Sequence, residues 1–346
     1  MNKILKKAAL FTDIHFGAKG NSERHNQDCL DYIDWFCEKV KNDSSIDHVI
    51  FLGDYFEHRN AISGMTLNYA YEGAKKINDL DMPSFWLNGN HDCFTRTNRN
   101  VVNTKPFEAL SNITMINDIT VIDYLGKEGV VLAPYLFREE YPKLLNYIQY
   151  PYLFIHGEFK GFVVTGDTVV CEHGADHNSL KAFKRIASGH FHKKQTKDNL
   201  NYIGNTFATS YADVHDINKG MCTLEYTTNE LVHINWEGCP YYGYLNLSDI
   251  IKDHKILNKT KASFKVQVDT DIEQSDLLKL RESLMKKYDL RELVFEEMKL
   301  DIVDGDATLD KELKMETVEN IIKNKLRTVE MEDIDNEYLV KLYEAL

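Results

Sequence analysis

The stretch Leu87-Asn88-Gly89-Asn90-His91-Asp92 joins the end of a predicted strand to a cluster of polar side chains. The apolar run Phe85-Trp86-Leu87 indicates a buried strand, and Gly89 marks a sharp exit from it. An amide, an imidazole and a carboxylate then follow within three residues. Because layered α/β folds often build active sites at the carboxyl edge of a buried strand, we expect a site here.

Four other predicted strands end in the same kinds of side chain. Strands at 8–12 and 48–52 precede the opening one, and strands at 152–155 and 185–188 follow it. Parallel strands bring their carboxyl ends to one edge of a sheet, so we expect these polar residues to meet. Collected from the strand ends, they are Asp13, His15, Asp54, Asn90, His91, His156, His190 and His192.

Carboxylate, imidazole and amide ligands without a thiolate favour Mn²⁺ or Fe over structural zinc. A single aspartate can bridge two ions about 3.5–4 Å apart. Asp54 suits that role because it follows the strand at 48–52, the middle one of the first three strands. Each motif alone is weak, because Asp13-x-His15 could also be an aspartate turn beside a surface histidine.

Composition narrows the class of protein. The 346 residues are 43% hydrophobic and 27% charged, as in globular proteins of more than one domain. No apolar run approaches the roughly 20 residues that span a bilayer, so we expect a cytoplasmic protein that binds no membrane. The six cysteines form no Cys-x-x-Cys pair, which argues against a zinc ribbon. The net charge of −13 argues against a general basic coat for nucleic acid but not against a local basic groove.

The chain divides into predicted segments of different pattern. Helices at about 26–41 and 66–80 alternate with the first strands, and shorter, more antiparallel strands follow residue 114, which indicates two packed sheets. The predicted segments are a motif-bearing domain at 1–245, a β-α-β capping domain at 246–300, an acidic linker at 301–310 and a helical pair at 311–346. The apolar stripes of the last helices either pack on the cap or bind helices of a partner.

In order along the chain, the motifs Asp13-x-His15, Gly53-Asp54, Gly89-Asn90-His91-Asp92, His156 and Gly189-His190-x-His192 resemble the signature of calcineurin-like metallophosphoesterases. With the cap and the helical C-terminus, the chain resembles the SbcD type, the small nuclease subunits of SbcCD-like recombination and repair complexes. Within that type it looks most like the phage subunits. One departure is Glu57, where some members place a second catalytic histidine, and His58 is one residue displaced.

The resemblance implies a four-layer αββα sandwich that holds two Mn²⁺ ions, with Mg²⁺ or Fe as substitutes. It implies that Asp13, His15, Asp54 and His192 hold one ion, and that Asp54, Asn90, His156 and His190 hold the other. His91 would act on the scissile phosphate or protonate the leaving oxygen. Asp92 completes the catalytic motif and would orient His91 or the turn.

The activity implied is that of a DNA exonuclease, with single-strand endonuclease activity left open. The implied partner is an SbcC-type ABC ATPase whose coiled coil the helical C-terminus binds, with a homodimer of the small subunit inside a heterotetramer. Basic residues on loops flanking the motifs are candidate contacts to the DNA backbone: Arg59, Arg96, Arg99, Lys105, Lys193 and Lys194. The alternatives are a phosphodiesterase or phosphatase for nucleotides or phosphoproteins, and a scaffold with a vestigial site.

Overall fold

The computed structural model describes residues 5–125, 128–165 and 169–297. Its first six-stranded sheet has the order β14-β13-β1-β2-β3-β4, with β1 to β4 parallel and β13 and β14 antiparallel. This confirms the predicted parallel core. The strands are β1 (Lys7–Phe11), β2 (His48–Phe51), β3 (Ser84–Leu87), β4 (Ile113–Ile116), β13 (Gly220–Glu225) and β14 (Glu230–Asn235).

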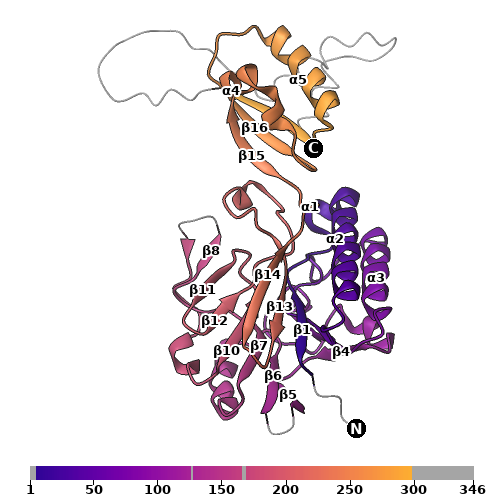
Figure 1. Ribbon diagram of the computed structural model, residues 1–346, viewed down its shortest axis with the longest axis vertical. Helices are drawn as coiled ribbons and strands as arrows, with labels where there is room; N and C mark the ends of the chain where they lie inside the picture. Colours follow the sequence, from indigo (N-terminus) through magenta and orange to yellow (C-terminus); the bar gives the residue numbers. More distant parts are fainter. Residues whose placement is uncertain (1–4, 126–127, 166–168, 298–346) are drawn as a thin grey trace, which may run out of the picture. The chain divides into compact units, whose positions relative to one another are not determined.

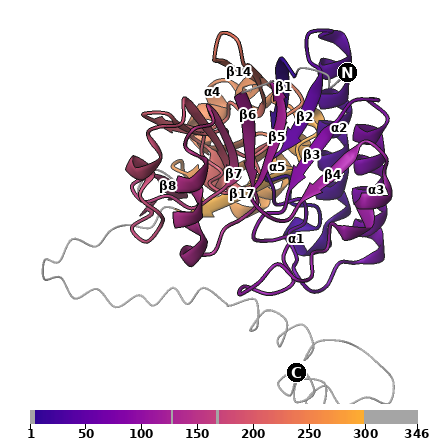
Figure 2. The same ribbon diagram turned by 90° about the horizontal axis from the view of Figure 1, so that it is seen from below.

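Two long helices connect β1, β2 and β3 and lie side by side along the outer face of this sheet (Figures 1 and 2). They are α2 (Glu23–Asn42) and α3 (Gly64–Asn78). Each begins at a serine, Ser22 or Ser63, whose side chain accepts a hydrogen bond from a backbone N–H of the first turn. A short turn of helix, α1 (Ala18–Asn21), precedes α2.

The second six-stranded sheet has the order β11-β12-β10-β7-β6-β5 and is also mixed. Its inner strands pair in parallel, whereas β5 and β11 are antiparallel to their neighbours. The strands are β5 (Thr120–Leu125), β6 (Glu128–Ala133), β7 (Tyr152–His156), β10 (Arg185–Gly189), β11 (Gln195–Lys197) and β12 (Leu200–Tyr202). A two-stranded ribbon of β8 (Val163–Thr165) and β9 (Val169–Val170) stands apart.

The two sheets pack face to face over a shared apolar core. Leu10 and Ile50 of the first sheet meet Leu132 and Phe154 of the second in this core. The alternate residues, such as Phe11, face α2 and α3 instead. Strands buried on both faces read as continuous apolar runs, which is why these segments were recognisable in the sequence.

The outer face of the second sheet is covered differently from that of the first. In the described part of the chain, the helices packed there are the 3-10 helices η2 (Arg138–Tyr147) and η3 (His177–Leu180), which contribute Leu144 and Leu180 to its core. Pro142 lies inside η2, and a proline lacks the N–H that an α-helix interior requires. The layer expected to be α-helical is therefore made of tighter turns and loops.

A third sheet has an apolar core of its own and consists of three parallel strands. Its strand β15 begins at Tyr242, before the boundary predicted at residue 245, and the domain limits stay a prediction. The elements here are β15 (Tyr242–Asn246), α4 (Leu247–Lys252), β16 (Ser263–Val268), α5 (Gln274–Tyr288) and β17 (Glu292–Glu297). The remaining 3-10 helices are η1 (Lys105–Ala109), η4 (Tyr211–Asp213) and η5 (His254–Leu257).

The predicted linker at 301–310 and the helical pair at 311–346 lie outside the described residues. Within the described ranges, no helix has the length and apolar character needed to cross a membrane.

Candidate metal centre

The loops that leave β1, β2 and β10 are tied together by backbone and side-chain hydrogen bonds. Asp13 N–H donates to Gly53 C=O (2.9 Å) and His15 N–H to Asp54 C=O (3.2 Å). From the second sheet, His190 N–H donates to Asp13 Oδ2 (3.1 Å). These bonds bring the ends of strands from both sheets to one place.

Four of the candidate ligands have a positive φ angle, a backbone conformation that residues other than glycine rarely adopt. Asp13, His15, Asp54 and His190 have φ angles of 52°, 53°, 61° and 91°. Non-glycine residues in this left-handed region are uncommon, and strain of this kind concentrates at functional sites. The local hydrogen bonds hold the strained loops in place.

Glycines before Asp54 and Asn90 allow the loops to approach closely. Gly53 has φ 103°, and a methyl group on it would lie 2.5 Å from Nδ1 of His156. A methyl group on Gly89 would collide with the Asp54 carboxylate. Only glycine fits at these two positions of the motifs.

The first candidate ligand group consists of Asp13, His15 and His192. The Nε2 atoms of the two histidines face each other at 3.1 Å, and each lies 3.8–3.9 Å from Asp13 Oδ1. Neighbouring ligands about 2.1 Å from one octahedral ion are separated by about 3 Å. The group therefore has the spacing of ligands that share a cation.

The second candidate group consists of Asp54, His156 and His190. Asp54 Oδ2 lies 3.3 Å from His156 Nε2, and Asn90 Oδ1 lies 3.0 Å from that nitrogen and 2.8 Å from His190 Nδ1. Since Asp54 Oδ2 is also 3.8 Å from His15 Nε2, Asp54 stands between the two groups. This is the place that a bridging carboxylate requires.

The pKa shifts at Asp13 and His190 favour the forms that bind metal. Burial alone would raise the pKa of Asp13, but the hydrogen bond with His15 and the charges of His156 and His192 lower it to about 2. Burial and the nearby His156 lower the pKa of His190 to about 3. At neutral pH the aspartate is charged and His190 is neutral, and both forms can bind a cation. At His156 burial would lower the pKa, but the charge of Asp54 raises it to about 9.

A hydrogen bond with the backbone just after β2 sets the orientation of the His156 ring. Its Nδ1 lies 2.7 Å from the C=O of Leu52, so Nδ1 carries the proton and Nε2 faces Asp54 and Asn90. Histidines that bind metal commonly donate their other N–H to a carbonyl or carboxylate. The residues present in the second group thus fit a metal ion.

His91 lies beside the two groups rather than within either. Its backbone N–H donates to Asp54 Oδ1 (2.8 Å), and its Nδ1 lies 2.7 Å from the C=O of Glu57. Its ring stands perpendicular to that of His15, with centroids 5.0 Å apart. With His15 and Glu57, His91 forms a third group whose possible ligand atoms lie within 4.8 Å of one another.

Asp92 is fully buried and holds the two strand exits together. Its carboxylate accepts hydrogen bonds from the backbone N–H groups of Asp54, Tyr55, Phe56 and Gly89, at 2.9–3.2 Å. These contacts position the turns that carry Asp54 and Asn90. These hydrogen bonds are those of a residue that positions the turn, which is one of the two roles predicted for Asp92.

Glu57 is a functional candidate to which the sequence pattern assigned no role. Its Oε2 lies 2.9 Å from Nδ1 of His15. The contact with His15 lowers the pKa of Glu57 to about 2. Its place three residues after Asp54 was the available signal, because carboxylates often lie behind metal-binding histidines.

The six basic candidates have different surroundings. The guanidinium of Arg99 is largely buried, pairs with both carboxylate oxygens of Glu140 (2.6 and 2.9 Å) and donates to two backbone carbonyls. Arg96 and Lys105 are exposed, and Arg59, Lys193 and Lys194 are half-buried. The contacts of Arg99 are those of a residue that stabilises the loop on which it lies.

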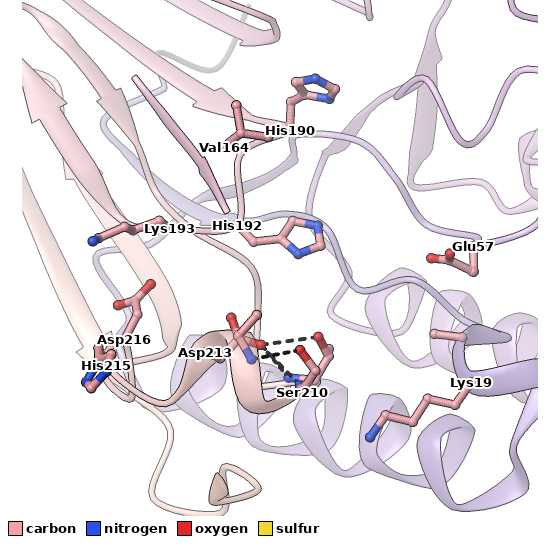
Figure 3. A pocket seen from close by; sticks show the side chains of 13 residues that line it. Lys19, Glu57, Val164, His190, His192, Lys193, Ser210, Asp213, His215 and Asp216 are labelled. Atoms are coloured by element: carbon pink, nitrogen blue, oxygen red, sulfur yellow. Dashed lines mark hydrogen bonds between the residues drawn. The ribbon is translucent and has the colours of Figure 1, made fainter. Parts of the chain in front are cut away.

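A cavity of about 490 Å³ opens beside the two ligand groups. Figure 3 shows His190 and His192 on one side of it and Glu57 and Lys19 across from them. Lys193 lines it as well. This cavity gives a substrate access to the ligand atoms.

Comparisons with known proteins agree with this geometry. Residues 6–256 match the family model described as Calcineurin-like phosphoesterase. Exonuclease subunit 1 of Enterobacteria phage T4 is 26% identical over 208 residues, which are 59% of this chain and 60% of that protein. The chain thus spans less than two thirds of the relative's length.

Solved structures give weaker matches. A nuclease MPE from Pseudomonas putida is 15% identical, with 65% of this chain and 87% of that one covered and a TM-score of 0.30. A dimetal phosphatase from Danio rerio is 10% identical, with 64% and 93% covered and a TM-score of 0.39.

Replacing Asp92 tests its positioning role. Asp92→Ala leaves four backbone N–H groups without their acceptor, and each buried unsatisfied group costs about 1–3 kcal/mol. We expect a loss of more than about 4 kcal/mol in the free energy of unfolding, measured with guanidinium chloride. Asp271→Ala, at an exposed loop position, is the control and should change little. A loss below about 1 kcal/mol in Asp92→Ala would contradict the assignment.

The Arg99–Glu140 pair predicts a pH dependence of stability. The hydrogen bond with Arg99 lowers the pKa of Glu140 from 4.5 to about 2. Because the folded pKa is depressed, the pair stabilises the fold above about pH 4.5, and this contribution is lost as the pH falls towards 2. The stability difference between wild type and Glu140→Gln, measured in urea, should shrink over that interval. Glu139→Gln, the exposed neighbour, should show no such trend, and a difference independent of pH would refute the prediction.

Proposed function

Because the chain belongs to the calcineurin-like phosphoesterase family, we propose that its metal centre hydrolyses phosphodiester bonds of DNA. The observation that carries the proposal is the convergence of Asp13, His15 and His192 with Asp54, His156 and His190, with Asp54 between the two groups. The similarity to a phage exonuclease subunit supports DNA as the substrate. The proposed activity is that of an exonuclease, with single-strand endonuclease cleavage as a second mode.

The proposed ligands of one ion are Asp13, His15, Asp54 and His192, and those of the other are Asp54, Asn90, His156 and His190. When bound, two divalent ions such as Mn²⁺ would clamp phosphate oxygens and lower the pKa of a water molecule. Mg²⁺ or Fe could take the same set of oxygen and nitrogen ligands.

His91 has the proton-transfer role in this proposal. Since its Nδ1–H is donated to Glu57, its Nε2 can hold a proton, donate it to a phosphate oxygen or deliver it to the leaving oxygen. The bond from His91 N–H to Asp54 Oδ1 fixes the residue relative to the bridging carboxylate. The same turn therefore positions a ligand and an acid.

The basic residues around the site would position DNA through its phosphates without reading the base sequence. Lys193 lies in the cavity that opens onto His190 and His192. The other proposed backbone contacts are Arg59, Arg96, Lys105 and Lys194. The protein's net charge of −13 favours the alternative of a nucleotide or phosphoprotein phosphoesterase, so the substrate must be tested directly.

We further propose that the chain works as a subunit. The relative is itself named as a subunit, which supports an assembly with an SbcC-type ABC ATPase in which this chain forms a homodimer within a heterotetramer. The proposed contact is the apolar stripe of the predicted helices at 311–346, which would bind helices of the ATPase coiled coil.

Substitution of His91 separates chemistry from metal binding. We expect His91→Ala to bind Mn²⁺ like wild type in isothermal titration but to hydrolyse DNA about 10²–10⁴-fold more slowly, because it loses a general acid. Asp54→Asn should lose both metal binding and hydrolysis. His254→Ala, at an exposed histidine of η5, is the matched control.

Full DNA hydrolysis by His91→Ala would refute the assigned chemistry. Mn²⁺-dependent turnover of nucleotides or phosphoproteins by wild type, with none on linear DNA, would establish the alternative substrate. Absence of any turnover with Mn²⁺ or Mg²⁺ would leave the scaffold as the remaining role.

The partner is tested in the full-length chain. Leu339→Asp combined with Leu342→Asp places charges in the predicted apolar stripe, and we expect loss of co-purification with a co-expressed SbcC-type ATPase. Lys341→Asp changes charge between the stripe positions and should leave the complex intact. Mn²⁺-dependent DNA hydrolysis should be unchanged in both variants, and retained association of the double variant would exclude this contact.

A further inference from the structure

A second cavity, of about 600 Å³, lies between η2 and the loops that follow β7 and β9. Small-molecule sites commonly have volumes of about 300–1,000 Å³. Aromatic and apolar side chains form its walls, and polar groups stand among them. The residues used in the argument below are Tyr135, Arg138, Tyr141, Leu145, Glu158 and His173.

This cavity adjoins the metal centre through one residue, Tyr135. The Tyr135 ring lines the cavity, and its centroid lies 5.8 Å from that of His190 and 6.2 Å from that of His156. Its backbone N–H donates to the C=O of Asn88, on the turn that carries Asn90. His190 also lines the first cavity, so the two cavities flank the same ligand group.

The polar groups of the cavity suit a ligand that donates hydrogen bonds. Glu158 lies two residues after His156, and its Oε1 accepts a contact from the Cys171 thiol at 3.4 Å, a weak donor. A carboxylate has room for several donors, so Glu158 keeps acceptor capacity. Its backbone N–H donates to the hydroxyl of Tyr141 (2.8 Å), which keeps Glu158 next to that ring.

The charges of the cavity argue against a second phosphate there. Glu158 lines it, and its carboxylate would repel a phosphate group. Asp176 also lines it but lies 3.7 Å from the ammonium of Lys160, and the cation Arg138 is at the mouth. The described histidine and carboxylate groups with the spacing of metal ligands all lie at the metal centre instead. A flat molecule with apolar faces and N–H groups on its edge matches these walls better.

A nucleobase has these properties. Its faces stack on aromatic and apolar side chains, and its edge presents N–H donors and acceptors. Arg138 and His173, both exposed, could supply donors at the mouth. We propose that this cavity binds the nucleobase adjoining the scissile phosphodiester, a proposal that rests on the DNA-hydrolase function above.

The proposal is tested by blocking the cavity and comparing two small phosphodiesters with Mn²⁺. The probes are the p-nitrophenyl ester of thymidine 5′-phosphate, which carries a base, and methyl p-nitrophenyl phosphate, which does not. Leu145→Trp would fill the mouth of the cavity at a side chain that is 46% exposed. Leu67→Trp, on α3 and 43% exposed, is the matched control.

We expect wild type to prefer the thymidine ester by kcat/KM. Leu145→Trp should raise KM for that ester about tenfold, the loss expected when one base-stacking contact is removed, and leave the base-free ester unchanged. Leu67→Trp should behave like wild type on both. An equal effect of Leu145→Trp on the two esters, or no preference in wild type, would overturn the proposal.

A second variant keeps the test decisive if Leu145→Trp does not fold. Glu158→Gln preserves shape and removes the charged acceptor, so the ratio of kcat/KM for the cytidine and thymidine esters should change by at least threefold. An unchanged ratio would overturn the role of Glu158. Hydrolysis of the esters by wild type without hydrolysis of DNA would instead refute the proposed function, and the two failures are thus distinguishable.

Discussion

The candidate centre depends on one buried carboxylate. Asp92 accepts hydrogen bonds from the backbone N–H groups of Asp54, Tyr55, Phe56 and Gly89. These groups belong to the exits of two adjacent strands, β2 and β3, which would otherwise end in loops with unsatisfied donors. A buried N–H without a partner is costly, so the carboxylate holds both loops in one conformation. That conformation sets Asp54 and Asn90 at the same place.

The second sheet completes the centre through contacts that cross the sandwich. His190 N–H donates to the Asp13 carboxylate, and His156 Nδ1 lies 2.7 Å from the C=O of Leu52. Each contact joins the end of a strand in one sheet to the end of a strand in the other. The strained backbone at Asp13, His15, Asp54 and His190 persists because these bonds and the close glycine contacts hold it in place. These hydrogen bonds therefore fix the loops that carry the candidate ligands to the ends of the strands.

The strand ends could be predicted from the sequence because strands buried on both faces leave long apolar runs, and a polar residue at their end is conspicuous. The runs before Asp54, His91 and His156 are of this kind. The order of motifs then predicts which side chains meet, since parallel strands share an edge.

What the sequence did not reveal are contacts between distant residues. The ion pair of Arg99 with Glu140 joins residues 41 positions apart. Arg99, predicted to contact DNA, therefore has the contacts of a residue that stabilises its loop. Glu57 lies behind His15 only because β1 and β2 are neighbours. Residues 138–147 form a 3-10 helix, and Pro142, which lacks a backbone N–H, lies inside it.

The two cavities suggest why the outer layer of the second sheet is irregular. The 3-10 helix η2 and the loop after β7 do not cover that face completely. They line the cavity of about 600 Å³ beside Tyr135. Tyr135 lines this cavity, and its ring centroid lies 5.8 Å from that of His190, which lines the other cavity. The irregular fourth layer therefore places the aromatic side chain of Tyr135 against the second group of candidate ligands.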